Sequence, residues 1–232
     1  MLEADGGQSA ALIHIPGMKS RSDALKTANI KWLVMLAVFD AAVVLFFVAP
    51  ELVSASTMAI LRASSTAVLP VAVLLLTGAL SHDAKARLVN WRIANPLPGG
   101  RVFSEYAPAD ARIDIKALTK NVGALPTDPG EQNAKWYKLH RLVGTDPAVA
   151  QAHKLYLMYR DIAGMSLLLI PLVPAALWYA GAPLASRWIA GGLFAVQYVV
   201  CAISARHSGT RFVCNVLAVH STTRVKTNPV QR

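Results

Sequence analysis

The chain has 232 residues, of which 54% are hydrophobic and only 16% are charged, and its formal net charge is +10. Soluble domains usually carry about 25% charged residues, so this composition argues against an ordinary soluble domain and indicates an integral membrane protein. A basic net charge is also typical of nucleic-acid-binding proteins, so the positions of the basic residues must separate the two classes.

Four apolar runs are each close to the roughly 20 residues that a helix needs to cross a bilayer. They are Lys31 to Val48, Ser56 to Leu80, Ile162 to Ala180, and Trp188 to Ser204. Charges are nearly absent inside these runs, whereas a core helix of a soluble protein keeps one polar stripe. The sequence therefore predicts an all-α integral membrane protein with four transmembrane helices, arranged as two hairpins around a small helical cytoplasmic cap.

Five parts follow from this pattern. They are an N-terminal cytoplasmic arm (1–30), a first transmembrane hairpin (31–80), a cytoplasmic helical cap (81–161), a second transmembrane hairpin (162–205) and a basic cytoplasmic tail (206–232). No secretory signal pattern precedes the first span, so we expect that span to direct insertion itself. In the tail, the apolar stretch Phe212 to Val219 is too short to cross a membrane, and we expect it to lie against the cap or along the inner membrane surface.

Basic residues fall on one side of the predicted membrane. All of the 23 lysines and arginines except Lys31, at the start of the first span, and Arg62 and Arg187 lie in the arm, the central block or the tail. Because cytoplasmic segments near membrane helices are enriched in Lys and Arg, both termini and the cap are predicted to be cytoplasmic. Topology alone explains the basic charge, which also suits anionic lipid head groups. Membrane lipids are thus expected partners and nucleic acid is not.

Asp40 and Arg62 are ionisable residues inside the first predicted hairpin. If the turn is centred near Glu51, each lies eleven residues from it, so both have the same depth. A charge inside a bilayer costs about 2.5 to 3.5 kcal/mol, which favours pairing. We predict an Asp40–Arg62 ion pair that either fixes the helix register or carries a function in an ion path or in opening. If the second span starts later, Arg62 instead reaches the outer interface.

Prolines interrupt the second and third predicted spans. Pro171 and Pro174 remove backbone donors, and Gln197 is expected at the depth of Pro171, where its amide could donate to the freed carbonyls. Pro70 also leaves backbone carbonyls without a donor in the second span, and the hydroxyl groups of the run Ser64 to Thr66 lie nearby in sequence as candidate partners. Such kinks are either ordinary features of spans or borders of a cavity, as in transporters.

Capping signals divide the central block into helices. The second span is expected to continue as a helix to Asn95, and a loop is expected from Pro96 to Asp110. Asp114, Asp128 and Asp146 occupy N-cap positions. They predict helices that end at Val122 and Leu142, and a third helix that starts at Pro147 and runs without a break into the third span.

Two surfaces of the cap are candidates for contact with a signal or with lipid. The two glycines before Arg101 could cradle an anion with its guanidinium, or they form only a turn. Trp136 and Tyr137 lie among Lys135, Lys138 and Arg141, and this aromatic and basic face could meet a nucleotide or anchor at the membrane surface.

No pattern in the sequence identifies a reaction. His82, His140 and His153 lack the spacing of metal ligands, and no phosphate loop, nucleophile elbow or pair of catalytic carboxylates is present. Cys201 and Cys214 are expected to stay reduced on the cytoplasmic side. We therefore predict no catalytic residues, no metal and no cofactor.

Several phrases of the chain resemble a family of small, uncharacterised bacterial inner-membrane proteins. They lie at Leu88 to Ser104, Ala111 to Asp114, Leu125 to Arg141, Asp146 to Asp161 and Gly209 to Ala218. The resemblance implies a four-span protein of the bacterial inner membrane, and comparable small four-span proteins serve as membrane components of anti-phage systems. It carries no catalytic residues to this chain.

Two functions are consistent with these predictions. The first is a non-enzymatic effector or sensor in anti-phage defence, whose cap receives a signal or partner and whose spans rearrange, oligomerise or permeabilise the membrane. Its partner would be either further copies of the chain or a cytoplasmic protein. The second is a transporter or an accessory subunit of a larger membrane complex. An enzyme that acts on lipid is a third reading, for which the sequence offers no site.

Overall fold

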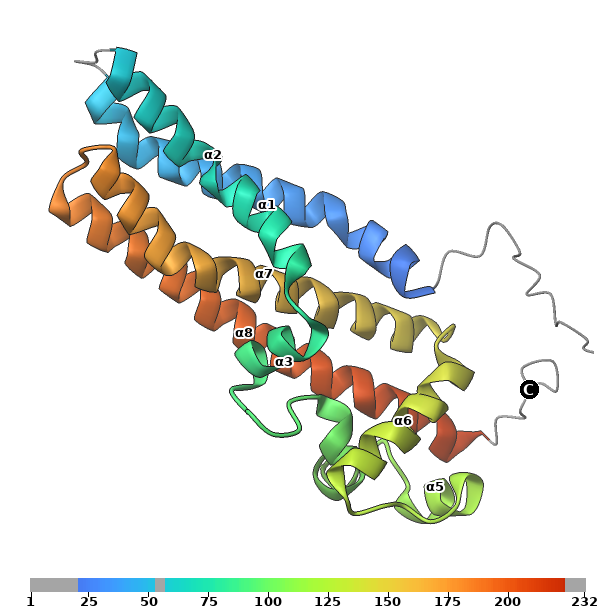
Figure 1. Ribbon diagram of the computed structural model, residues 1–232. Helices are drawn as coiled ribbons and strands as arrows, with labels where there is room; N and C mark the ends of the chain where they lie inside the picture. Colours follow the sequence, from blue (N-terminus) through green and yellow to red (C-terminus); the bar gives the residue numbers. More distant parts are fainter. Residues whose placement is uncertain (1–20, 53–56, 224–232) are drawn as a thin grey trace, which may run out of the picture.

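The computed structural model describes residues 21–52 and 57–223, and within these ranges the chain forms helices and connecting turns without any strand. The all-α prediction is thereby confirmed. Four long helices form an elongated bundle in which α1 lies along α2 and α7 lies along α8 (Figure 1). They span Arg21–Leu52 (α1), Thr57–Ala79 (α2), Pro147–Tyr179 (α7) and Leu184–Thr222 (α8).

Three of the described helices are long and apolar enough to cross a membrane: α7, α8 and the Asn29–Phe47 part of α1. α2 has 23 residues, but its apolar stretch, Ser64–Leu76, is shorter. Large apolar side chains are exposed along all four helices, as at Phe46 (74%) and Leu75 (75%). Contiguous apolar surface of this extent is unfavourable in water, so these faces support a membrane location.

α3 spans His82–Asn90 and lies beside the middle of α7 and α8. Further short helices gather at one end of the bundle, where α7 begins and α8 ends (Figure 1). The cap helices follow: the 3-10 turn η1 (Pro98–Arg101), the π-helical turn η2 (Val102–Tyr106), α4 (Ala107–Ala109), α5 (Ile115–Val122) and α6 (Pro129–Val143).

The three predicted helix starts in the central block are confirmed by the hydrogen bonds of their N-cap side chains. Asp114 accepts hydrogen bonds from the backbone N–H groups of Lys116 and Ala117. Asp128 accepts from Glu131, and Asp146 accepts from Ala148 and Val149. α5 and α6 end within one residue of the predicted positions, and α7 runs from Pro147 to Tyr179 without a break.

Two predictions for the segment after α2 are wrong. The second span does not continue to Asn95, because Ser81 has an extended backbone (ψ 156°) and its hydroxyl caps the separate helix α3 at the Ala84 N–H. The expected loop to Asp110 instead contains η1, η2 and α4. Gln132 stabilises η2, because its Oε1 accepts from the backbone N–H groups of Phe103 and Ser104.

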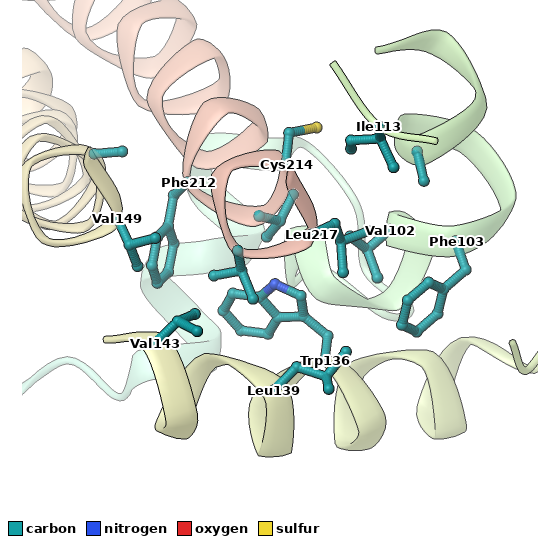
Figure 2. Packing of buried hydrophobic residues seen from close by; sticks show 14 of the residues in the cluster. Val102, Phe103, Ile113, Trp136, Leu139, Val143, Val149, Phe212, Cys214 and Leu217 are labelled. Carbon is teal, nitrogen blue, oxygen red and sulfur yellow. The ribbon is translucent and has the colours of Figure 1, made fainter. Parts of the chain in front are cut away.

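One apolar core joins the cap helices to the ends of α7 and α8 (Figure 2). We call it the cap core. It includes Val102, Phe103, Ile113, Trp136, Leu139, Val143, Val149, Tyr156, Phe212, Val216 and Leu217. The apolar stretch of the predicted tail therefore lies against the cap helices, and it does so as the last turns of the unbroken helix α8.

α8 approaches α7 and η1 most closely at Gly209. A Cβ atom there would lie 3.1 Å from two ring carbons of Tyr156 and 3.2 Å from Pro98 Cγ. We expect Gly209→Leu to force these groups apart and to lower the free energy of unfolding by about 1 to 3 kcal/mol. Thermal unfolding in detergent measures this loss. Gly192→Leu is the control, because nothing lies within 4 Å of a Cβ at Gly192, and equal losses in both variants would contradict the packing argument.

Candidate functional site

α3 lies where the apolar bundle meets the cap helices, and charged side chains bind it to α7. Asp161 Oδ1 is 3.0 Å from Lys85 Nζ and 3.0 Å from Arg160 Nη2, so one carboxylate faces two cations. Lys85 and Arg160 are buried, and Arg160 Nη1 also contacts His82 Nδ1 of α3. Two desolvated cations depend on this one carboxylate, which makes the contact sensitive to any change in local charge.

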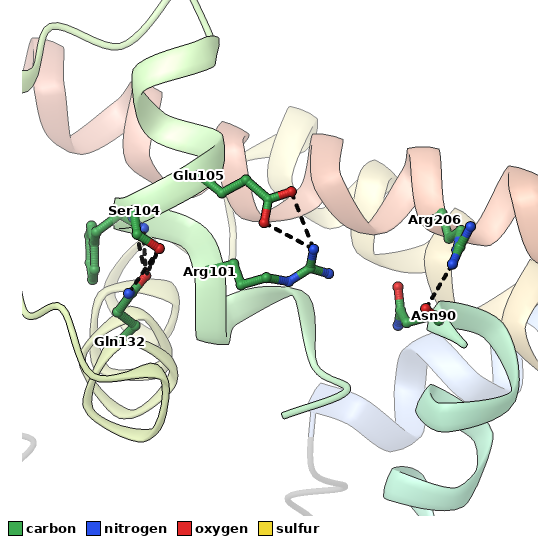
Figure 3. A network of polar contacts seen from close by, with 7 residues as sticks. Asn90, Arg101, Ser104, Glu105, Gln132 and Arg206 are labelled. Atoms are coloured by element: carbon green, nitrogen blue, oxygen red, sulfur yellow. Dashed lines mark hydrogen bonds and ion pairs between the residues drawn. The ribbon is translucent and has the colours of Figure 1, made fainter. Parts of the chain in front are cut away.

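A second set of contacts binds α3 to α8. Trp91 Nε1 donates to Tyr198 Oη at 2.9 Å, and that hydroxyl donates to Leu88 O at 2.7 Å. Arg206 donates to Asn90 O at 2.7 Å, as Figure 3 shows, and its guanidinium lies 3.8 Å from the centre of the Trp91 ring. A cation over an indole face is a favourable contact.

We call these residues the α3 junction: His82, Lys85, Leu88, Asn90, Trp91, Arg160, Asp161, Tyr198 and Arg206. The junction connects α3 with both helices that continue into the cap core. Its contacts are ionic and hydrogen-bonded, and beside them Val89 of α3 packs in a small apolar cluster with Ala163 of α7 and Ala202 and Ala205 of α8. These bonds join α3 to both α7 and α8, so the arrangement can act as a latch between the three helices.

A buried carboxyl group lies inside the apolar part of the bundle. Asp40 is only 1% exposed, and its Oδ2 accepts a hydrogen bond from Gln197 Nε2 of α8 at 3.3 Å. Gln197 thus bonds to α1, whereas the sequence predicted that it would bond to carbonyls freed by Pro171. Thr66, near Pro70 in α2, donates to Ala176 O of α7 at 3.3 Å.

The predicted Asp40–Arg62 ion pair lies outside the described part of the structure, which does not include the side chain of Arg62. The turn differs from the prediction, because α1 continues through Glu51 to Leu52 and α2 begins at Thr57. Asp40 is therefore twelve residues from the end of α1, while Arg62 is five residues from the start of α2. The prediction of equal depth depended on a turn centred near Glu51, and Glu51 instead lies inside α1.

The interrupted turn of α7 is covered by α8 rather than open. Pro174 has no N–H with which to bond Ile170 O, four residues before it. A Cβ atom on Gly191 would lie 3.1 Å from Pro174 Cγ and 3.6 Å from Ile170 O, so α8 packs closely against this turn. Pro171, one turn before Pro174, is exposed on the outside of the bundle.

Arg101 is engaged within the cap helices. Its Nη1 lies 3.0 Å from Glu105 Oε2, as Figure 3 shows, and its guanidinium lies 5.1 Å from the centre of the Tyr106 ring. The preceding glycines are buried, and a Cβ atom on Gly99 would lie 3.0 Å from Trp136 Cε3. The loop therefore serves close packing against α6, and its glycines do not form an open anion cradle.

The aromatic and basic face predicted on α6 loses one of its two aromatic members. Trp136 is buried in the cap core and packs against Phe212 of α8, with ring centroids 5.1 Å apart (Figure 2). Lys135 Nζ donates to Ala124 O, and burial lowers the pKa of this lysine. Tyr137, Lys138 and Arg141 remain exposed, so the surface still offers charge and a phenol ring but no indole.

The histidines of the cap pack against aromatic rings. His153 stacks on Phe212 with centroids 4.3 Å apart, and His140 lies 5.4 Å from His153. Among the described residues, no group of three or more His, Cys, Asp or Glu side chains could hold a metal ion. These rings therefore belong to the cap core.

Sequence reasoning missed most of the α3 junction. Lys85, Asp161 and Tyr198 received no role, although one signal was present: Arg160 and Asp161 directly precede the apolar run that starts at Ile162. Charges at the end of a membrane-length helix face either lipid head groups or a neighbouring helix. A pair of opposite charges at such a position indicates a neighbouring helix.

The fold and the junction define an all-helical protein with membrane-length helices whose ends share one apolar core with a set of short helices. Comparisons with family models, with curated proteins and with solved structures found no match to this chain. The geometry described above therefore carries the functional argument.

Proposed function

We propose that the chain is a non-enzymatic sensor or effector of the bacterial inner membrane, in which a signal or partner at the cap changes the packing of the spans. One observation carries this proposal. α7 and α8 each run without a break from the apolar bundle into the cap core, so a shift of the cap helices reaches the bundle through two rigid connections. Packed helices of this kind transmit small displacements over a long distance.

In this proposal α1 with α2 and α7 with α8 are two transmembrane hairpins, which makes four spans. Exposed aromatic residues support the membrane limits, because Trp and Tyr concentrate at both interfaces. Trp178, Tyr179 and Trp188 are exposed near the turn between α7 and α8, and Trp91 is exposed at the opposite end, beside the cap helices. The basic residues on the cap side favour cytoplasmic termini and a cytoplasmic cap.

The α3 junction is the element that a signal would act on. A two-state switch needs an arrangement that is stable when complete and costly when partly broken. Asp161 with its two cations meets this condition. A partner that draws α3 away from α7 would release α7, and the bundle would repack around Asp40 and Gln197.

The resemblance of several phrases to small inner-membrane proteins supports anti-phage defence as the setting. In that setting the chain acts as a homo-oligomer or with a cytoplasmic partner protein, and its spans rearrange or permeabilise the membrane. Exposed apolar faces on all four long helices provide contact area for further copies.

The test is to express the chain in a bacterial host and to challenge the cells with a panel of phages. We expect fewer plaques for at least one phage, together with growth arrest and entry of a membrane-impermeant dye, all relative to an empty vector. Asp40→Asn should weaken dye entry, because it removes the buried charge beside Gln197. Ser166→Ala is the control, since Ser166 is equally buried but bonds only within its own helix, to Ile162 O. No protection and no dye entry with any phage would contradict the proposal.

A transporter or accessory subunit is the second candidate, and one observation favours it. Asp40 has a buried Oδ1 atom without a hydrogen-bond partner in the described part of the chain, and ionisable groups inside spans often mark ion or proton paths. Purification in mild detergent separates the candidates. A homo-oligomer supports the effector, whereas a stable complex with a larger membrane enzyme supports the accessory subunit.

A further inference from the structure

A groove of about 800 Å³ opens along α8 at the cap end of the bundle. α8 contributes most of its lining, α7 contributes two apolar residues, and the segment after α4 contributes two charged ones. The lining residues are Asp110, Arg112, Ala152, Leu155, Arg206, His207, Ser208, Thr210, Arg211 and Cys214.

The groove carries an excess of positive charge. Arg112 donates to both carboxylate oxygens of Asp110, at 2.9 and 2.6 Å, and to Asn215 Oδ1 at 3.0 Å. These hydrogen bonds from Arg112 lower the pKa of Asp110 to about 2, so Asp110 stays ionised and offsets Arg112. Arg206 and Arg211 are then left as uncompensated cations of the groove. Guanidinium groups match phosphate in both charge and geometry.

Arg206 is held in place before any ligand arrives. Asn90 O and the Trp91 ring fix its guanidinium, as described for the α3 junction. Arg211, by contrast, is exposed and lies five residues, or about 1.4 helical turns, further along α8. A preorganised cation lowers the entropic cost of binding an anionic group, whereas Arg211 can adapt to that group at the cost of ordering its own side chain.

An exposed apolar stripe leads along α8 into the groove. Val196, Val200 and Ile203 are exposed by 64%, 56% and 43%, and His207 and Arg211 continue the same spacing of three or four residues. Residues at this spacing lie on one face of a helix. The face is therefore apolar along the bundle and basic at the cap.

The change from apolar to basic occurs where a bilayer interface is expected. His207 lies about 6 Å beyond Ile203 along the helix axis, and Arg211 lies about 12 Å beyond it. The head-group region of one leaflet is about 5 to 8 Å thick, since a bilayer of 40–45 Å contains a 30 Å hydrocarbon core. Trp91, whose ring lies against the Arg206 guanidinium, is a residue typical of this boundary.

We propose that the groove binds the phosphate head group of an anionic phospholipid, whose acyl chains lie along Val196, Val200 and Ile203. Arg206 and Arg211 bind the phosphate, and the apolar stripe binds the chains. The site rests on the membrane placement of the proposed function but not on its role in signalling. Because Arg206 also belongs to the α3 junction, the lipid contributes directly to the contact between α3 and α8.

The test uses the full-length protein in nanodiscs and in detergent, with native mass spectrometry to count bound lipids. Phosphatidylglycerol and cardiolipin are expected to bind at least tenfold more tightly than phosphatidylcholine. Arg211→Gln should weaken phosphatidylglycerol binding about fivefold, which is the effect of one basic residue near an anionic lipid surface. Arg141→Gln is the control, because Arg141 is also exposed but lies on α6 outside the groove. This variant should bind phosphatidylglycerol as tightly as the wild type does.

Separate arms identify the source of the phosphate. Inorganic phosphate and glycerol 3-phosphate should bind far more weakly than the lipid, because they lack the acyl chains. Ile203→Asn should reduce the affinity for lipid and leave the affinity for inorganic phosphate unchanged. Equal binding of phosphate and lipid would overturn the lipid site. Equal loss in Arg211→Gln and Arg141→Gln would overturn the groove as the location. Failure to enter nanodiscs would instead refute the membrane placement, and failure in the phage assay would refute only the sensor.

Discussion

Asp161→Asn is expected to release α3 from α7 and to lower the free energy of unfolding by about 3 kcal/mol. The substitution keeps the size of the side chain but removes the charge that Lys85 and Arg160 share at 3.0 Å. Breaking a buried ion pair by removing one partner is strongly destabilising, since the remaining cations stay desolvated without compensation. Thermal unfolding in detergent and hydrogen exchange of the α3 amides measure the effect.

Glu105→Gln is the matched control for this prediction. Glu105 also lies 3.0 Å from an arginine, Arg101, but its side chain is 52% exposed. Exposed ion pairs contribute between 0 and about 1 kcal/mol, so this variant should unfold almost as the wild type does. Lys85→Met combined with Asp161→Asn should recover part of the loss, because it removes one of the two uncompensated cations. Equal effects of Asp161→Asn and Glu105→Gln would contradict a buried latch.

The helices of the cap were predictable because their starts depend on local chemistry. Asp114, Asp128 and Asp146 each bond to backbone N–H groups two or three residues ahead, so a short stretch of sequence contains the whole interaction. The break at Ser81 has the same local origin, but the apolar spacing on both sides of it predicted one continuous helix. The single hydrogen bond from Ala84 to the Ser81 hydroxyl outweighs that spacing.

The contacts inside the apolar bundle were harder to predict because they join helices that are far apart in the sequence. Matching depths within one hairpin requires the position of the turn, and an error of a few residues moves a partner by several ångströms. Gln197 was assigned to the hairpin that contains it, yet it bonds to Asp40 on α1. A sequence does not state which face of one hairpin meets the other, so this pair appears only when α1 is seen beside α8.

Trp136 shows the opposite case, in which the sequence held the answer. Its basic neighbours suggested a surface position, but Gln132, Trp136, Leu139 and Val143 recur at helical spacing and are all buried. Periodicity reports which face of a helix is buried, whereas neighbouring charges report only the composition of the segment. Where the two disagree on an amphipathic helix, periodicity is the better guide.

Phe212→Ala is expected to separate the cap helices from α8 and to cost about 3 to 5 kcal/mol. Phe212 is 4% exposed, and its ring lies 5.1 Å from that of Trp136, 5.0 Å from His140 and 4.3 Å from His153. Removing a buried phenyl ring loses its transfer free energy and leaves a cavity between three elements. Hydrogen exchange of the α6 amides should rise, and thermal unfolding in detergent should occur at a lower temperature.

Phe194→Ala separates this effect from a general loss of packing in α8. Phe194 is also buried on α8, but it packs in the apolar bundle core with Leu169 and Val173 of α7. Its truncation should raise exchange in the bundle and leave the α6 amides protected. Phe212→Ala also tests whether the proposed response of the spans needs the cap. Because this variant removes the connection to the cap, it should abolish phage-triggered dye entry while the protein still inserts into the membrane. Dye entry that persists after Phe212→Ala would mean that the spans respond without the cap.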